Sequence, residues 1–343
     1  MAQVYVASRA AIAAVGALLM LTQHWSFAQL VGRWDVLHFI DIAQNGYAEQ
    51  GSPAFFPGLP LLLRAGSAIG ISMPLTGVII GLVCSGLAAA ALYKLFGAPA
   101  ACLWLIAPTA VFTVVGYSEA AFCAAAFWAW QRAGQNKWGQ AALLAGLACT
   151  FRITGLFLLA GLAVYVLAQK IGRRPKLIHL VWLLIPVAVL GGYVLYLHQI
   201  TGSWLAWWDA QQVGWGRSFA SPWASLLNTI QAGHLSEWPG RPDVAWVFRA
   251  EIVSMAAGVA ATVITLWRRQ WAQATYVGSQ VVAFGTSIWY MSVNRALLVW
   301  FPLWAIGRPK SQPGRVALGV AAGLSAAAML VWAWLFFTGR WAS

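Results

Sequence analysis

Long apolar runs constrain the fold of this chain more than any other feature of its sequence. They recur from residue 4 to residue 338, and most approach the roughly 20 residues that an α-helix needs to cross a bilayer. Hydrophobic residues make up 61% of the 343 residues and charged residues 8%, whereas a soluble globular protein carries about 25% charged residues. The sequence therefore predicts an all-α polytopic membrane protein: one transmembrane domain over residues 1–343, with about 10–12 helices that cross or enter the membrane.

Basic residues form short clusters between the apolar runs. The spans between the clusters put all of them on one side, which the positive-inside rule makes cytoplasmic. Membrane topology and anionic lipids explain the net charge of +13 better than a nucleic-acid partner does, because the cations do not gather on a polar face. The clusters are Arg132 with Lys137, Lys170 to Lys176, Arg268 with Arg269, and Arg308 to Arg315.

This orientation makes residues 32–55 the first outer loop and residues 201–244 a large second one. The second loop is rich in tryptophan, which favours a cap at the membrane interface over a disordered segment. The four cysteines all lie inside apolar runs and form no Cys-x-x-Cys pair, so they predict neither a disulfide nor a metal site.

The spans that follow the first outer loop do not alternate simply across the membrane. With the basic clusters on one side, two complete passes over residues 56–95 would leave only one pass for residues 98–134. Either the run at 56–72 partly re-enters the membrane, or the run at 98–116 is broken at Pro108, where proline removes a helical hydrogen bond. The sequence leaves both alternatives open.

The first outer loop concentrates acidic residues, which are rare in this chain. It holds Asp35, Asp41 and Glu49, three of the eight acidic residues of the protein. In a helix from Trp34 to Asn45, Asp35 and Asp41 would lie with His38 within an arc of about 120°, opposite a broad apolar face. Such a helix is typical of the membrane interface, with its polar stripe turned to water or to a cavity.

The helix is followed by a rigid turn with Pro53, Pro57 and Pro60. Together the two segments read Trp-Asp-x-x-His-Phe-x-x-Ile-Ala-x-x-Gly-Tyr and then Ala-Phe-Phe-Pro-x-x-Pro. This pattern resembles the first luminal loop of the PIG-V family, which comprises GPI mannosyltransferases II. The resemblance implies a GT-C glycosyltransferase fold and a polyprenyl-phosphate-sugar donor. The short chain looks like a bacterial relative, and since most bacteria make no GPI, we expect a different acceptor.

Asp35 is the predicted general base. Sugar transfer from a lipid phosphate requires that the acceptor hydroxyl lose its proton as it attacks the anomeric carbon, and a positioned carboxylate typically accelerates such a step by about 10²–10⁴-fold. The phosphate is a fair leaving group by itself, so the reaction requires no covalent intermediate. The alternative interpretation is a solvated carboxylate at the membrane interface.

Five further segments supply predicted substrate-binding residues. Tyr117 and Glu119 belong to a Gly-Tyr-Ser-Glu motif that resembles PIG-V, although Glu119 could simply be a carboxylate favoured by a helix N-terminus. Arg152, in an Arg-x-x-Gly segment, and Arg295, before Trp-Phe-Pro, also resemble family motifs. Guanidinium groups bind phosphate oxygens in pairs, so we expect both to hold the donor phosphate. The remaining predicted binding residues are Arg64, Phe56, His38 and Asp41.

Two roles remain open for the stripe residues His38 and Asp41. They could bind the sugars and tune Asp35, or they could complete a site for Mg²⁺ or Mn²⁺, for which oxygen and imidazole ligands are suitable. Their spacing is weak support for a metal, so we expect no cofactor.

The sequence thus predicts an inverting glycosyltransferase in a bacterial plasma membrane, with its site on the periplasmic side. It would move a hexose, by resemblance mannose, from a polyprenyl-phosphate-sugar donor to a glycolipid or glycan acceptor. The alternative is a transporter or flippase of a lipid-linked sugar, for which the absence of a visible internal repeat is unfavourable. A purely structural membrane subunit would leave the first-loop motif unexplained.

Overall fold

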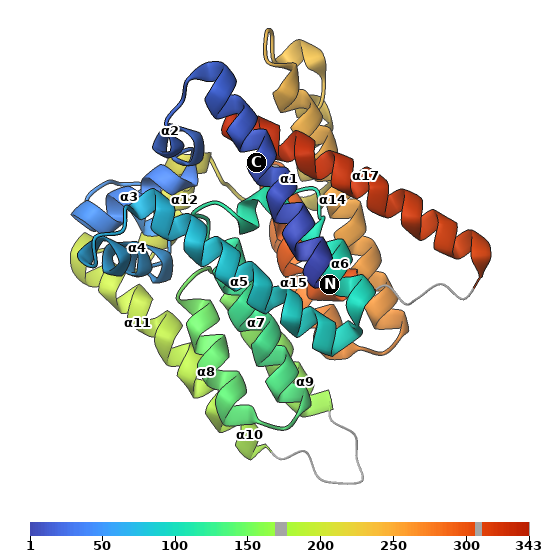
Figure 1. Cartoon of the computed structure of the whole chain (residues 1–343). Coiled ribbons are helices and arrows are strands. Elements are labelled where there is room, and N and C mark those ends of the chain that lie inside the picture. Colours follow the sequence, from blue (N-terminus) through green and yellow to red (C-terminus); the bar gives the residue numbers. More distant parts are fainter. Residues whose placement is uncertain (169–176, 306–310, 343) are drawn as a thin grey trace.

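The computed structural model describes residues 1–168, 177–305 and 311–342. Within these ranges the chain forms helices and irregular segments, with one isolated β-bridge between Phe219 and Ser287 (Figure 1). The α-helices are α1 (Ala2–Gln23), α2 (Phe27–Val31), α3 (Asp35–Asn45), α4 (Gly58–Ala68), α5 (Met73–Phe96), α6 (Ala98–Leu105), α7 (Glu119–Gly134), α8 (Trp138–Cys149), α9 (Gly155–Ala168), α10 (Ile178–Trp182), α11 (Leu184–Thr201), α12 (Ala206–Trp215), α13 (Pro222–Ala232), α14 (Pro242–Trp267), α15 (Trp271–Gly285), α16 (Val293–Val299) and α17 (Gln312–Phe337). The short 3₁₀ helices are η1 (Ser52–Ala54), η2 (Ala110–Thr113), η3 (Leu235–Glu237) and η4 (Phe301–Trp304).

Among the described residues, five helical segments are long and apolar enough to cross a membrane: α1, α5, α14, α17 and the combined stretch Ile178–Thr201. Two shorter helices, α8 and α9, are also apolar. The predicted all-α polytopic membrane fold is confirmed. The basic residues predicted at positions 170–176, 308 and 310 lie outside the described residues.

The structure interrupts both of the runs for which the sequence left alternatives open. The 11 residues of α4 rise only about 16 Å, which is too short for a full crossing. The run at 98–116 is also broken, because α6 ends at Leu105 and irregular backbone with η2 continues to Ser118. Neither run therefore forms one continuous helix of membrane-spanning length.

The irregular segment between α6 and α7 is buried, so its backbone polar groups need partners inside the protein. Arg9 of α1 reaches across to it, and its Nη1 donates to the Thr113 hydroxyl at 3.0 Å and to the Ala110 carbonyl at 3.4 Å. The Thr109 hydroxyl donates to the Asn294 carbonyl at 3.0 Å. These bonds fix the segment against α16, and Tyr117 and Glu119 follow directly from it.

The central helix α7 organises the packing of the bundle. It is rich in alanine and buried along most of its length, and it packs between α5 and α8. Small side chains let helix backbones approach closely in membrane proteins. On the other side of the bundle, α9 packs on α15, and α15 packs on α14. Figure 1 shows α17 meeting α1 near the C-terminal end of α17 and extending away from it.

The predicted outer loop 201–244 is not an irregular loop. It folds into α12, α13 and η3, and α12 packs against η1 of the first outer loop and against α11. Several of its tryptophans remain exposed, including Trp204 and Trp223. The two predicted outer loops therefore meet at one end of the bundle, where the site residues also lie.

Candidate functional site

Asp35 is the first residue of α3, as the sequence led us to expect for a helix that begins near Trp34 and stops at Gly46. Trp34 has a φ of 52°, a conformation that costs a non-glycine residue about 1–3 kcal/mol. The Asp35 backbone N–H donates to the Tyr117 hydroxyl at 3.3 Å. The strained residue and this bond together fix where the helix starts, and so where the Asp35 carboxylate lies.

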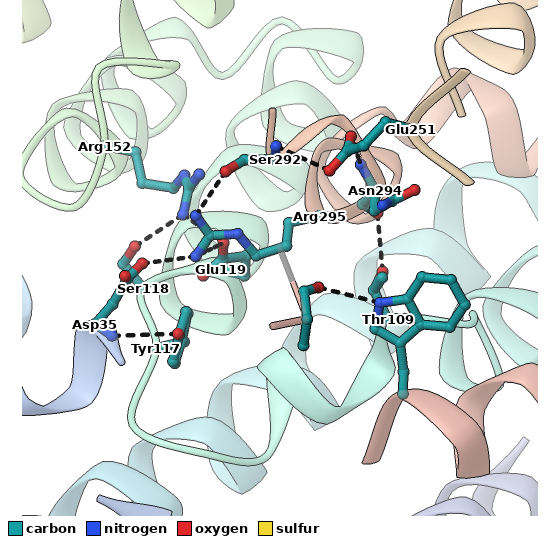
Figure 2. A network of polar contacts seen from close by, with 12 residues as sticks. Asp35, Thr109, Tyr117, Ser118, Glu119, Arg152, Glu251, Ser292, Asn294 and Arg295 are labelled. Carbon is teal, nitrogen blue, oxygen red and sulfur yellow. Dashed lines mark hydrogen bonds and ion pairs between the residues drawn. The ribbon is translucent and has the colours of Figure 1, made fainter. Parts of the chain in front are cut away.

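Four charged side chains form a continuous chain of ion pairs. Arg295 Nη1 lies 2.7 Å from Asp35 Oδ2 and 3.6 Å from Glu119 Oε1. Arg152 Nη1 lies 2.7 Å from the same Glu119 oxygen and donates to the Ser118 hydroxyl at 3.0 Å. The Glu119 side chain is 0% exposed, while those of Asp35 and Arg152 are each 19% exposed. Figure 2 shows that both guanidinium groups converge on Glu119, so this acid orients them from beneath.

Arg295 is further held by aromatic rings and by its own helix. Its guanidinium carbon lies 5.3 Å from the Tyr117 ring centroid and 5.5 Å from that of Phe112, within the range of cation–π attraction. Its Nη2 donates to the Ser292 hydroxyl at 3.0 Å. Burial lowers the pKa of Arg295, but the charges of Asp35 and Glu119 outweigh this effect and raise the pKa above its ordinary value. The guanidinium therefore stays charged.

A buried carboxylate that we did not predict anchors the helix that carries Arg295. Glu251 of α14 accepts hydrogen bonds from the backbone N–H groups of Ser292 at 3.0 Å and Asn294 at 2.9 Å (Figure 2). Ser292, the N-cap of α16, has a φ of 66°, which is strained for a residue with a side chain. The sequence did carry a signal for Glu251, which is an acidic residue inside an apolar run. Such residues are rare and usually have a function.

Two pockets meet at these residues, and a third adjoins the second. The first, here called the aromatic pocket, has a volume of about 590 Å³. The second, the arginine pocket, has about 120 Å³, and the third, the apolar pocket, has about 410 Å³. The aromatic pocket is lined by Trp34, His38, Phe112, Tyr117, Trp215, Trp238, Phe248, Trp289 and Trp341, among others.

Adjacent pockets share lining residues. Asp35, Arg295 and Ser292 line both the aromatic and the arginine pocket. Phe56 and Trp207 line both the arginine and the apolar pocket. The apolar pocket continues between α9, α11 and the start of α12 and is walled mostly by aliphatic and aromatic side chains. The Asp35–Arg295 ion pair thus lies at the junction between a wide aromatic cavity and a small cationic one that leads to an apolar cavity.

Comparison with known proteins bears on the family resemblance predicted from the sequence. The chain is 35% identical over 147 residues to GPI alpha-1,6-mannosyltransferase 2 of Mus musculus, and 31% identical over 147 residues to the Homo sapiens protein. The predicted resemblance to the PIG-V family is confirmed. Each match covers 37% of this chain, which spans only 29% of the length of these PIG-V relatives. No protein-family model and no solved structure matches the chain.

Most of the residues selected for their resemblance to PIG-V lie together. Besides the Asp35–Arg295 pair, the aromatic pocket contains His38 and Tyr117 in its wall, and the arginine pocket contains Arg152 and Phe56. The His38 ring stacks on Phe55, with centroids 5.0 Å apart. Glu119 lines neither pocket and contacts the two arginines from the protein interior.

Asp41 and Arg64 lie apart from the other predicted site residues. Neither lines any of the three pockets. Asp41 Oδ1 accepts a hydrogen bond from the Asn45 amide at 2.7 Å, one turn further along α3, and Arg64 is exposed on α4. In the described part of the chain, no three His, Cys, Asp or Glu side chains are grouped so as to hold a metal ion, and His38 and Asp41 do not join Asp35 in such a group.

Arg217 is a further site residue that the sequence did not reveal. It follows α12 in the large outer loop and lines the arginine pocket with Arg152 and Arg295. No spacing in the sequence relates these three positions, which come from three separate segments and are brought together only by the tertiary packing. The available signal was weak: a Gly-Arg pair, Gly216 and Arg217, at the end of a tryptophan-rich helix.

Proposed function

We propose that this protein is an inverting mannosyltransferase that moves mannose from a polyprenyl-phosphate donor to a hydroxyl of a glycolipid or glycan. The observation that carries the proposal is the position of Asp35, between one pocket that can admit an acceptor and another that is lined with arginines. The mannosyltransferase activity named for the mouse and human relatives supports the choice of sugar.

Direct displacement at the anomeric carbon requires the attacking hydroxyl and the leaving group on opposite sides of the sugar ring. In our proposal the acceptor enters through the aromatic pocket, whose rings suit the apolar faces of sugars, and its hydroxyl lies next to Asp35. The oxygen–carbon bond forms as the carbon–phosphate oxygen bond breaks. The hydroxyl proton passes to Asp35, and the electron pair leaves with the phosphate. Asp35 can act as the base with one oxygen while its other oxygen remains paired with Arg295.

The leaving phosphate would be held by Arg152 and Arg295. Both are fixed before substrate binds, because Glu119 contacts them from the interior. Charge that is already oriented costs no reorganisation as the transition state forms, and a water-poor cleft strengthens its effect. Glu119 therefore positions the two cations and does not touch the substrate.

The polyprenyl chain of the donor would extend into the apolar pocket. Phe56 and Trp207 connect this pocket to the arginine pocket, so a phosphate and an attached hydrocarbon chain can occupy the two together. A soluble sugar nucleotide would place a polar base and ribose against an almost wholly apolar wall, which is unfavourable. This contrast supports a lipid-linked donor.

We assign the site to the outer side of a bacterial plasma membrane. Helix α7 begins beside the site with Glu119 and carries Arg132 in its last turn. Helix α14 begins beside the aromatic pocket and is followed by Arg268 and Arg269. Both helices lead from the site to basic residues, and by the positive-inside rule this supports a site on the periplasmic or extracellular face.

The test uses the purified protein in detergent, polyprenyl-phosphate [³H]mannose as donor and a lipid extract of the source cells as acceptor. Replacing the base, Asp35→Asn, should lower transfer by about 10²–10⁴-fold in a protein that still folds, although loss of the ion pair with Arg295 should lower its unfolding temperature. Asp41→Asn is the matched control, because it makes the same change on the same helix outside the pockets, and it should transfer normally. Wild-type turnover by Asp35→Asn would refute the base. A wild-type protein that binds the donor without transferring mannose would favour a flippase.

A further inference from the structure

The arginine pocket contains more positive than negative charge. Guanidinium groups reach it from three distant segments, as Arg152, Arg217 and Arg295. Two carboxylates balance them: Asp35 pairs with Arg295, and Glu119 lies within ion-pair distance of Arg152 and Arg295. In the described residues no carboxylate lies within ion-pair distance of Arg217. Of these three guanidinium groups, that of Arg217 is therefore the one without a carboxylate at ion-pair distance in the described residues.

The local backbone directs Arg217 inward. Gly216, with a φ of 59°, ends α12 in the left-handed conformation, and the Arg217 N–H turns back to the Gln211 carbonyl at 3.3 Å. The Arg217 guanidinium carbon lies 6.0 Å from the Phe284 ring centroid. The Arg217 Nε is buried and has no hydrogen-bond partner among the described residues. A buried donor without a partner is costly, so the side chain is arranged for a ligand that supplies an acceptor.

The surroundings of Arg217 also disfavour its charge. Burial lowers the pKa of Arg217, and the neighbouring charges of Arg295 and Arg152 lower it further, while the charges of Glu251 and Asp35 offset these effects only in part. An anion between the three guanidinium groups would reverse this effect. A phosphate diester, such as a sugar joined to a lipid through one phosphate, carries such a negative charge.

We propose that Arg217 completes a phosphate subsite with Arg152 and Arg295 and binds the phosphate of a lipid-monophosphate-linked sugar. The inference rests on the proposed function and adds a residue to its donor-phosphate site. The pocket volume of about 120 Å³ accommodates a phosphate group, since one liquid water occupies about 30 Å³. The adjoining apolar pocket receives the hydrocarbon chain.

The experiment measures binding and does not need turnover. The full-length protein in detergent is titrated with farnesyl phosphate, with farnesol and with inorganic phosphate. Arg217→Gln should weaken farnesyl phosphate binding about 10- to 100-fold, the effect of losing a charge-assisted hydrogen bond, and leave farnesol binding unchanged. Arg217→Lys retains the charge and should lose less affinity than Arg217→Gln, which separates loss of charge from misfolding.

Arg132→Gln is the matched control for this series. Arg132 also lies over an aromatic ring, 5.3 Å from the Trp128 centroid, but it belongs to the last turn of α7 and lines none of the pockets. It should bind farnesyl phosphate as the wild type does. If Arg217→Gln also binds farnesyl phosphate like the wild type, the subsite is wrong.

The other outcomes separate this inference from the proposed function. Inorganic phosphate that binds as tightly as farnesyl phosphate would indicate a site for free phosphate and overturn the lipid-phosphate assignment. Binding of farnesyl phosphate that depends on Arg217, in a protein that transfers no mannose, would leave the subsite standing while the proposed function fails. If Arg217→Gln transfers mannose and binds farnesyl phosphate with full affinity, the subsite fails while the proposed function stands.

Discussion

Glu119 is a buried acid between two arginines, so substitutions at this position and at Arg152 can separate effects on stability from effects on substrate binding. In Arg152→Gln, Glu119 loses its partner at 2.7 Å and keeps only Arg295 at 3.6 Å. Removing one partner of a buried ion pair typically costs about 3–5 kcal/mol. Because Arg152 is 19% exposed and a second cation remains, we expect a smaller loss of unfolding free energy, about 2–3 kcal/mol.

The double variant Glu119→Gln with Arg152→Gln removes both charges. It should recover most of the lost stability, because neither a buried anion nor its cation is left without a partner. Its affinity for farnesyl phosphate should stay as low as that of Arg152→Gln, since the phosphate-binding cation is still absent. From Arg152→Gln to the double variant, stability would thus return and binding would not.

Unfolding would be followed by tryptophan fluorescence during SDS titration in mixed micelles, and binding by titration with farnesyl phosphate. A double variant no more stable than Arg152→Gln would refute the electrostatic role of Glu119. An Arg152→Gln variant with wild-type stability would show that the ion pair adds nothing to folding. Recovery of phosphate binding in the double variant would show that Arg152 does not contact the phosphate.

Two further predictions concern how the site is held in position. Glu251→Ala removes the acceptor of the Ser292 and Asn294 N–H groups. It should lower the free energy of unfolding by about 1–3 kcal/mol and raise the KM for the donor, because α16 carries Arg295. Glu251→Gln retains one acceptor oxygen and should show smaller changes in the same unfolding and kinetic assays. Tyr193→Phe removes a hydroxyl that contacts the Pro53 and Phe55 carbonyls at 2.9 and 2.8 Å. It should lower the free energy of unfolding by about 1 kcal/mol and make the first outer loop more sensitive to limited proteolysis. Unchanged proteolysis would contradict this role.

Several features of the site follow from short stretches of sequence. The helix Asp35–Asn45 and its stop at Gly46 were predictable because periodicity and a glycine act within a few residues. A pattern of this kind does not show which residues of the polar stripe reach a pocket. Asp35 and Asp41 share a stripe on the helix, but they are six residues apart, about 9 Å along its axis. A pocket that opens at one end of a helix reaches only the first of them.

The sequence by itself determined the membrane class, the acid-bearing helix and the motif arginines, because hydropathy, helical period and rare residue types are properties of contiguous segments. Only the tertiary structure decided that Arg217 shares a pocket with Arg152 and Arg295, and that Glu251 anchors α16. These relations join residues far apart in the chain. Each charge takes its partner from whichever segment the packing of the helices brings within a few ångströms, and no local pattern records that choice.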